Sequence, residues 1–162
     1  MTLEERIEQL EQSNYKLSGR GKYSYVYTNG NHCVKLINSQ DTAQLNYLTD
    51  PNFKFMCGQY HPNYVFSNTS RDGFYEFYGR RFDRPPQKYR GVTWKHYIRC
   101  IKDYAYKGKY SYLLGEGLAT AIDFIVKEAK EKDYIVDIHN LNIMFDGNQL
   151  VINDPIAPRK EK

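Results

Sequence analysis

The stretch that decides the fold is DIHNLNIMF, which occupies residues 137–145 of a chain of 162 residues. It starts as a polar loop and passes directly into an apolar strand. A tight turn, DGN at 146–148, comes next, and LVI at 150–152 predicts a second strand that pairs with the first. The second strand ends in NDP at 153–155, so polar residues stand at both open ends of one hairpin.

The polar residues of this hairpin have the order and spacing of a phosphoryl-transfer centre. In the pattern D-x-[K/H]-x-x-N, the Asp orients an acceptor hydroxyl, the Lys or His approaches the transferred phosphate, and the Asn gives an amide oxygen to magnesium. Asp137, His139 and Asn142 match these positions, and Asp154 follows twelve residues after Asn142. The end of the second strand is where the main magnesium carboxylate is expected. The pattern therefore predicts ATP and Mg²⁺ as ligands, with Asp137 and His139 catalytic and Asn142 and Asp154 binding the metal.

The N-terminal half carries a weaker signal of the same chemistry. Gly19, Gly21, Ser24 and Val26 match the pattern G-x-G-x-x-[small]-x-V, in which the glycines let backbone N–H groups approach phosphate oxygens and the valine covers adenine. Lys35 follows nine residues after Val26 in an apolar strand, where a kinase lysine holds the α- and β-phosphates. Each signal is common in isolation, since lysines on edge strands are usually solvated. Together they predict that these five residues bind the nucleotide, with Lys35 also catalytic.

Hydrophobic periodicity predicts the remaining elements. A capping box at 2–5 opens a short helix, and a turn at 29–31 joins strands within 15–27 and 32–37. Two further strands are expected at 64–66 and 74–78. Helices are expected at 40–48, where Pro51 ends the helix, at 93–104, and at 114–132, which carries an apolar stripe. The fold class is therefore α+β, with a small antiparallel sheet and one helix in the N-terminal half and a reduced helical part that carries the hairpin.

Composition and charge limit the function classes. The chain is 41% apolar and 15% aromatic, enough to bury one core, and its formal net charge of +4 suits an anionic ligand or an acidic partner. Its three cysteines are dispersed, which argues against a disulfide framework or a zinc site and for a reducing cytosol. No apolar run has the length of a membrane span, so we expect a cytoplasmic protein without a membrane partner.

At residues 136–145 and 152–155 the sequence resembles the protein-kinase-like superfamily, and it looks closest to the early serine/threonine protein kinases of virulent podophages. In that family the catalytic loop runs Asp-x-His-x-x-Asn-Ile-Met-Phe, and Pro follows the metal-binding Asp. The resemblance implies one minimal kinase-like domain, with an N-lobe at 1–78, a hinge or crossover at 79–92, a reduced C-lobe at 93–158 and a tail at 159–162.

The same resemblance implies roles for these residues and for the whole chain. Gly19, Gly21, Ser24 and Val26 would form the nucleotide loop, and the backbone of residues 78–82 would contact adenine. The chain would transfer the γ-phosphate of ATP to Ser, Thr or Tyr of host proteins, or to itself, in the cytoplasm of the host. Host proteins of transcription and translation are the implied partners.

Some positions depart from the family pattern. Ser24 stands where the third glycine is expected, and no Glu lies between Lys35 and residue 73, so the acid that usually pairs with this lysine is missing. Asp41 is expected to replace it, or Gln44 through a neutral hydrogen bond, with Asp50 as a poorer third choice. The sequence ends eight residues after Asp154, where a full protein kinase continues into an activation segment and helices that hold the peptide. We therefore expect a reduced lobe whose apolar surface a second copy would cover.

Two other functions stay open. A kinase-like binding protein would block a host protein, with vestigial nucleotide binding. A cluster of basic residues supports this weakly and would also suit a nucleic acid. The cluster consists of Arg80, Arg81, Arg84, Lys88, Arg90, Lys95, Arg99 and Lys102. A small-molecule kinase is suggested by His139, since the sequence here resembles aminoglycoside and choline kinases, in which His replaces Lys. The large helical lobe with which those enzymes hold their acceptor is not expected here.

Overall fold

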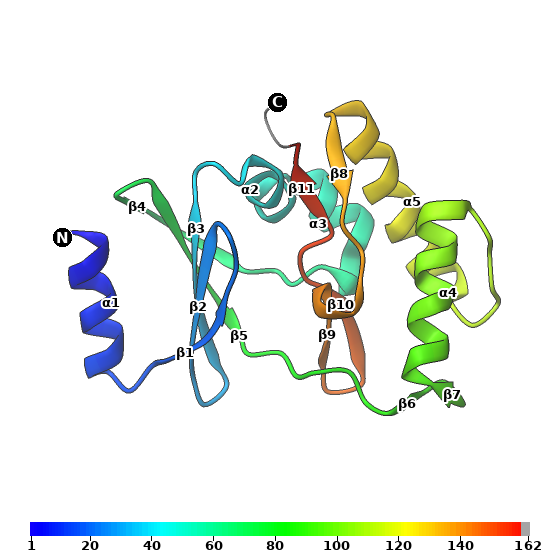
Figure 1. Cartoon of the computed structure of the whole chain (residues 1–162), viewed down its shortest axis with the longest axis horizontal. Helices are drawn as coiled ribbons and strands as arrows, with labels where there is room; N and C mark the ends of the chain where they lie inside the picture. The colour runs from blue at the N-terminus through cyan, green and yellow to red at the C-terminus, as the bar shows by residue number, and fades with distance from the viewer. Residues whose placement is uncertain (160–162) are drawn as a thin grey trace.

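The N-terminal half folds into an antiparallel sheet because its apolar residues alternate along strands that tight turns connect. In the computed structural model, which describes residues 1–159, the five strands lie in the order β1-β2-β3-β5-β4 (Figure 1). They are β1 Lys16–Arg20, β2 Ser24–Asn29, β3 His32–Asn38, β4 Val65–Arg71 and β5 Phe74–Arg80. Gly30 has a φ of 57° in the turn from β2 to β3, and Gly73 has a φ of 79° in the turn from β4 to β5. Two-residue hairpin turns need such left-handed backbone, which glycine adopts freely.

Strand β3 is buried on both faces. Val34 and Leu36 pack on one face against the N-terminal helix α1 (Leu3–Gln12), through Leu10. Cys33 and Ile37 belong to the core on the other face, and Lys35 between them is 3% exposed. Because successive side chains of a strand point to opposite faces, Lys35 lies on the inner face, toward the C-terminal half.

A buried carboxylate connects α1 to the sheet. Glu76 is 2% exposed, and its carboxylate accepts hydrogen bonds from Arg6 Nε at 2.8 Å and Arg71 Nη1 at 3.1 Å. The hydroxyl of Tyr78 also donates to it. Burial alone would raise the pKa of Glu76, but the hydrogen bonds from Arg6 and Tyr78 outweigh burial and hold that pKa below its ordinary value. The charged form of Glu76 therefore stabilises the contact between helix and sheet.

Pro51 ends one helix, as expected, but it also begins another that the sequence analysis did not predict. Helix α2 covers Thr42–Thr49, and α3 covers Pro51–Cys57. The side chain of Asp50 caps α3 by accepting from Asn52 N at 2.9 Å, and proline is well tolerated at the first position of a helix, where no N–H is needed. The expectation of one helix in this part of the chain is thus corrected to two, followed by a short 3₁₀ turn, Gly58–Tyr60.

The C-terminal half contains the expected hairpin and helices. Helices α4 (Trp94–Lys107) and α5 (Gly115–Glu131) confirm the predicted helices. The hairpin is formed by β9 (Ile143–Asp146) and β10 (Gln149–Ile152), as predicted. Four short strands were not predicted. They pair as β6 Lys88–Tyr89 with β7 Val92–Thr93, and β8 Tyr134–Val136 with β11 Ile156–Pro158. Of the expected tail, only Arg159 is described, and 160–162 lie outside the described residues.

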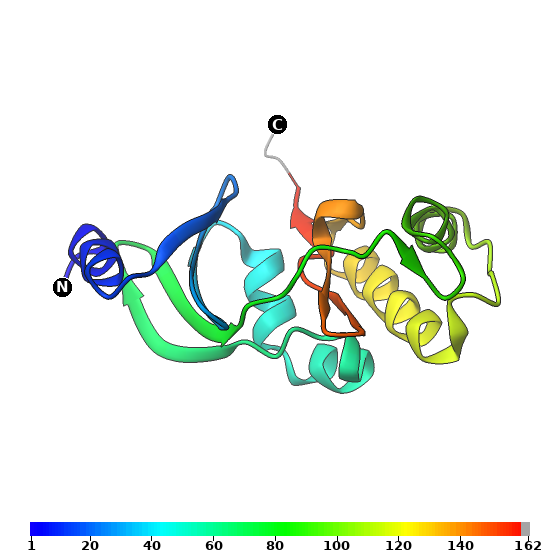
Figure 2. The ribbon, with the colours of Figure 1, turned by 90° about the horizontal axis from the view of Figure 1, so that it is seen from below.

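One hydrophobic core joins the two halves. It extends from Ile37 of the sheet through Tyr47 of α2 to Ile125 of α5 and Phe145 of β9. The hydroxyl of Tyr47 donates to the carbonyl of Ile152 at 2.6 Å. The segment after β5 runs from the sheet past the β9–β10 hairpin toward α4 (Figure 2). The α+β fold class is thus confirmed. Along the chain, the sheet, the connecting segment, the helices and the hairpin follow in the order expected for a protein-kinase-like fold. Within residues 1–159 no helix is long and apolar enough to cross a membrane.

We expect Glu76→Gln to lower the free energy of unfolding at pH 7 by roughly 2–4 kcal/mol, because two arginines would lose their buried carboxylate. Because folding lowers the pKa of Glu76, its charged form stabilises the fold above pH 4.5, the ordinary pKa of a Glu side chain. This stabilisation is lost as the pH falls through the pKa of Glu76 in the folded protein. Urea titrations between pH 3 and 7 test this, since the variant should lack that part of the acid dependence. Asp146→Asn is the control, because it removes the exposed pair with Arg80 at 3.5 Å. Equal losses in both variants would contradict the role of Glu76.

Candidate functional site

Two backbone hydrogen bonds place the polar loop 137–142 beside the segment 153–155. Asp137 N donates to the carbonyl of Pro155 at 2.7 Å, and Asn153 N donates to the carbonyl of Asn142 at 2.8 Å. The first bond continues the pairing of β8 with β11, and the second continues the β9–β10 hairpin. Asp154 therefore lies between two fixed backbone positions. The sequence analysis missed the β8–β11 pairing, for which the apolar run at 134–136 was the only signal.

Within the loop, three side chains form one hydrogen-bonded group. The amide nitrogen of Asn142 donates to the carbonyl of Asp137 at 2.7 Å, which leaves the amide oxygen available as a ligand. His139 Nδ1 accepts the N–H of Leu141 at 3.1 Å, so in a neutral ring the proton is on Nε2. His139 Nε2 lies 3.1 Å from Asn142 Nδ2 and 3.3 Å from Asp137 Oδ1. The loop thus presents an oriented carboxylate, a ring N–H and an amide oxygen.

Helix α4 supports the loop from its other side. The hydroxyl of Tyr106 accepts the N–H of Ile138 at 2.9 Å and lies 3.2 Å from the carbonyls of Val136 and Ile138. At the start of the helix, Trp94 Nε1 donates to Asn140 at 2.6 Å. Trp94 and Tyr106 were not predicted to be part of the site, because the prediction of a helix at 93–104 does not show which residues its side chains contact.

Lys35 is brought to the same site from the sheet. It pairs in register with Val26 on β2 and with Phe77 on β5, and its ammonium group lies 5.7 Å from the centre of the Tyr64 ring. When its amide oxygen faces Lys35, Gln44 accepts a hydrogen bond from Nζ and donates through its nitrogen to Asp41 Oδ2 at 3.2 Å. Gln44 is 1% exposed, so this contact is buried. Of the expected replacements for the missing Glu, Gln44 contacts Lys35 directly and Asp41 acts through it, while Asp50 caps α3 instead.

The carboxylates around Lys35 are destabilised in their charged forms. Burial raises the pKa of Asp154 from 3.8 to about 7, Lys35 opposes this shift, and the charges of Asp41 and Asp137 add to it. Burial likewise raises the pKa of Asp41, against a backbone hydrogen bond from Gln44 and the charge of Lys35. Oδ1 of Asp154 is buried and has no hydrogen-bond partner within residues 1–159. A buried carboxylate oxygen without a partner is costly unless a cation meets it.

A magnesium ion fits this donor set. Asp154 offers a carboxylate oxygen and Asn142 an amide oxygen, which are the hard oxygen ligands that Mg²⁺ prefers. The described residues contain no group of three His, Cys, Asp or Glu side chains suited to a metal. A site with one protein carboxylate is typical of Mg²⁺ that takes its remaining ligands from phosphates and water.

The predicted nucleotide loop forms the β1–β2 hairpin. Gly19 pairs with Val26 across the two strands, and Gly21 N donates to the carbonyl of Ser24 at 3.0 Å. Val26 is half-buried against the core that contains Phe77. Strand β2 of this hairpin pairs with β3, which carries Lys35.

The space beneath the expected adenine-binding segment contains aromatic rings. A side-chain carbon at Gly79 would overlap the ring of Tyr64. That ring also lies 5.8 Å from the ring of Phe82, and its hydroxyl donates to Asn153 Oδ1 at 3.2 Å. Gly79 is thus required by the close approach of Tyr64, which connects the end of β5 to the residue before Asp154. Gly79 lies within the segment expected to contact adenine, whereas Tyr64 was not predicted to be part of the site.

Comparison with known proteins finds similarity only to solved structures. No protein-family model matches the chain, and no curated protein matches it. Among solved structures, the chain is similar to the streptomycin-ATP-APH(2")-IIa ternary complex, with a probability of 1.00, 14% sequence identity and a TM-score of 0.41. The match covers 98% of this chain and 73% of that one.

We expect Asp154→Asn to raise the free energy of unfolding of the ligand-free protein by roughly 2 kcal/mol at pH 7. The raised pKa of Asp154 means that its charge destabilises the fold increasingly as the pH rises from 3.8 to about 7, so the gain should disappear near pH 4. Urea denaturation in the presence of a chelator measures this. Asp133→Asn, at an exposed ion pair with Arg159, should change stability by less than about 0.5 kcal/mol. A loss of stability in Asp154→Asn would show that its carboxylate is satisfied.

Proposed function

We propose that the chain is an ATP- and magnesium-dependent phosphotransferase whose acceptor is a hydroxyl group on a protein. The observation that carries this proposal is the convergence of Asp137, Asn142 and Asp154 at a site that also contains buried Lys35. A protein that only binds a partner has no need for this set. Phosphoryl transfer needs positioning and charge stabilisation more than covalent chemistry, and this set supplies both.

Each residue has a separate task in the proposed reaction. The carboxylate of Asp137 accepts the proton of the acceptor hydroxyl, the hydroxyl oxygen attacks the γ-phosphorus, and the bond from that phosphorus to the bridging oxygen of ADP breaks. His139 Nε2–H, held beside Asp137, donates to the transferred phosphate. Lys35 supplies a fixed positive charge for the α- and β-phosphates. Magnesium held by Asn142 and Asp154 would neutralise charge on the phosphate oxygens.

The resemblance of residues 137–145 to early protein kinases of virulent podophages supports a protein acceptor. Under this proposal the chain modifies Ser, Thr or Tyr of host proteins in the host cytoplasm, or modifies itself. Tyr110 and Tyr112, which are 55% and 83% exposed, offer hydroxyl groups for self-modification.

We expect Asp137→Asn to reduce phosphoryl transfer by about 10²- to 10⁴-fold, because the amide cannot accept the proton of the hydroxyl. Labelled ATP with magnesium is incubated with the protein alone and with a bacterial lysate, and intact mass is measured before and after. The variant should keep the rise in melting temperature that ATP with magnesium gives to the wild type, whereas Asp154→Asn should lose it. Unchanged labelling in Asp137→Asn would contradict the assigned role.

We expect Gln44→Leu to reduce transfer by roughly 10- to 100-fold, because buried Lys35 would lose the hydrogen bond that fixes its ammonium group. Gln44→Glu restores an acceptor of similar shape and should recover most of the rate. Measuring kcat and KM for ATP in both variants separates this positioning role from simple loss of folding, which circular dichroism checks. Equal activity of the Leu and Glu variants would show that Gln44 does not position Lys35.

The alternative is a kinase-like binding protein in which nucleotide binding is vestigial. The observation that favours it is the Tyr64 ring, which packs against Gly79 beneath the segment expected to contact adenine. A nucleotide would have to share this space with the ring. A rise in melting temperature with ATP and magnesium, without transfer to any lysate, would favour this alternative. The absence of any such rise would reject both proposals.

A further inference from the structure

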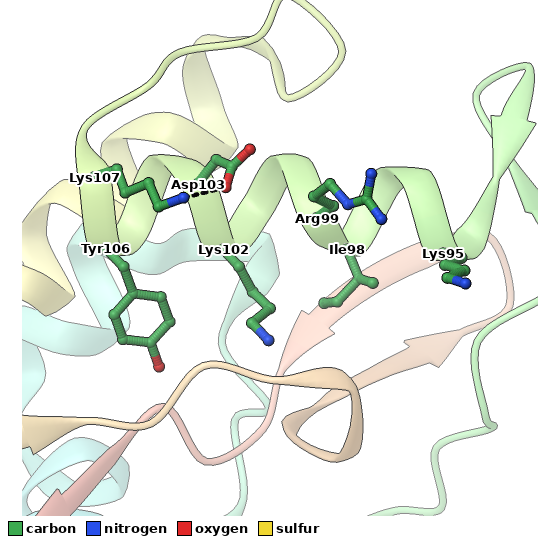
Figure 3. A pocket seen from close by; sticks show the side chains of 7 residues that line it. All are labelled: Lys95, Ile98, Arg99, Lys102, Asp103, Tyr106 and Lys107. Carbon is green, nitrogen blue, oxygen red and sulfur yellow. Dashed lines mark ion pairs between the residues drawn. The ribbon is translucent and has the colours of Figure 1, made fainter.

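A basic groove lies along one face of α4. The pocket there has a volume of about 480 Å³. Its charged lining consists of Lys95, Arg99, Lys102 and Lys107, together with Asp103. We call the face formed by these residues the basic groove. Figure 3 shows Lys102 pointing from α4 toward the ribbon of the catalytic loop, on the same side of the helix as Tyr106. The nucleotide site does not account for this groove, because neither Lys35 nor the β1–β2 hairpin lines it.

The groove adjoins the residue proposed to accept the proton. Tyr106 lines the groove, and its hydroxyl contacts the backbone of Val136 and Ile138, the neighbours of Asp137 on both sides. Trp94 at the start of the same helix donates to Asn140. Helix α4 is thus held against the catalytic loop at both of its ends. A molecule bound in the groove would lie next to the loop that carries Asp137.

The charge of the groove is mostly uncompensated. Lys107 pairs with Asp103 at 3.8 Å. Within residues 1–159, no carboxylate lies within ion-pair distance of Lys95, Arg99 or Lys102. These three residues follow one another at intervals of four and three positions, so they share one helix face over about 10 Å of axis. Like charges in such a row repel one another, and a bound anion would relieve that repulsion.

We propose that the basic groove binds an acidic peptide segment of the acceptor protein and so brings a neighbouring hydroxyl to Asp137. The inference rests on the proposed phosphotransferase function, and it names the class of acceptor. In an extended peptide, side chains on the same side are about 6.6 Å apart. Two such carboxylates can therefore contact two of the cations, which are spread over about 10 Å of the helix. Each contact is a charge-assisted hydrogen bond at an open surface, so binding should be weak and sensitive to salt.

Other occupants suit the groove less well. A polycationic small molecule would be repelled by Lys95, Arg99 and Lys102. Nucleic-acid sites commonly neutralise about 6–10 phosphates, more than three uncompensated cations can. A short acidic peptide with a free hydroxyl avoids these conflicts.

Binding is tested on the full chain without nucleotide, by fluorescence anisotropy with a labelled heptapeptide of six Glu around a central Ser. The variant R99E/K102E reverses two groove charges, and K127E/K130E makes the same charge change on exposed residues of α5. We expect R99E/K102E to weaken binding by about tenfold or more and the control to retain it. Asp103→Asn, which removes the carboxylate from the groove, should tighten binding. A heptapeptide with Lys in place of Glu should not bind.

Three results would overturn the inference. The first is that the acidic heptapeptide does not bind the wild type, and the second is that R99E/K102E and the control weaken its binding equally. The third is that a single-stranded 12-nucleotide DNA binds the wild type more tightly than the heptapeptide does, and that R99E/K102E abolishes this DNA binding. The thermal shift with ATP and magnesium should be the same in the wild type and R99E/K102E. If that shift is absent in the wild type while the heptapeptide binds the groove, the proposed phosphotransferase fails and the anion site stands. If the shift is present and the heptapeptide does not bind, only the groove assignment fails.

Discussion

The geometry of the site depends on two backbone hydrogen bonds, from Asp137 N to Pro155 O and from Asn153 N to Asn142 O. A buried backbone N–H must find a partner, so these bonds are strongly favoured once the two segments meet. They fix both ends of the loop 137–142 against the segment that carries Asp154. The backbone thus connects the loop to this segment, and the side chains of Asp137, Asn142 and Asp154 are not needed for that connection. The amide oxygen of Asn142 and Oδ1 of Asp154 are thus available to ligands.

The partner of Lys35 has a consequence for the charge of the site. A carboxylate in contact with Lys35 would neutralise its charge, whereas the amide of Gln44 orients the ammonium group and leaves its charge intact. That charge then acts on Asp154, whose pKa it lowers against the effects of burial and of two other carboxylates. In the proposed function the same charge faces phosphate. The absence of a Glu between Lys35 and residue 73 is therefore compatible with a working site, because Asp41 orients the amide of Gln44 through its nitrogen.

Local signals predicted those parts of the fold that local chemistry determines. Turns at Gly30 and Gly147 require positive φ, and both were predicted from the sequence between two apolar runs. The pairing of β8 with β11 joins residues about twenty positions apart through strands of three residues, too short for a periodic pattern. Likewise, Tyr64 becomes part of the site only because the start of β4, which it precedes, pairs with the end of β5. Helix α3 was missed because Pro51 was read as a stop signal, although proline also starts helices.

The catalytic loop has two sides with different tasks. On one side, its backbone bonds to residues 153–155, which place the carboxylate of Asp154 beside the loop. On the other side, Tyr106 and Trp94 bond to it from α4, which carries the basic groove. Because Tyr106 bonds to the backbone at 136 and 138, a shift of α4 would move the backbone on both sides of Asp137. The position of the helix that would bind the acceptor is thus coupled to the position of the carboxylate that would accept its proton.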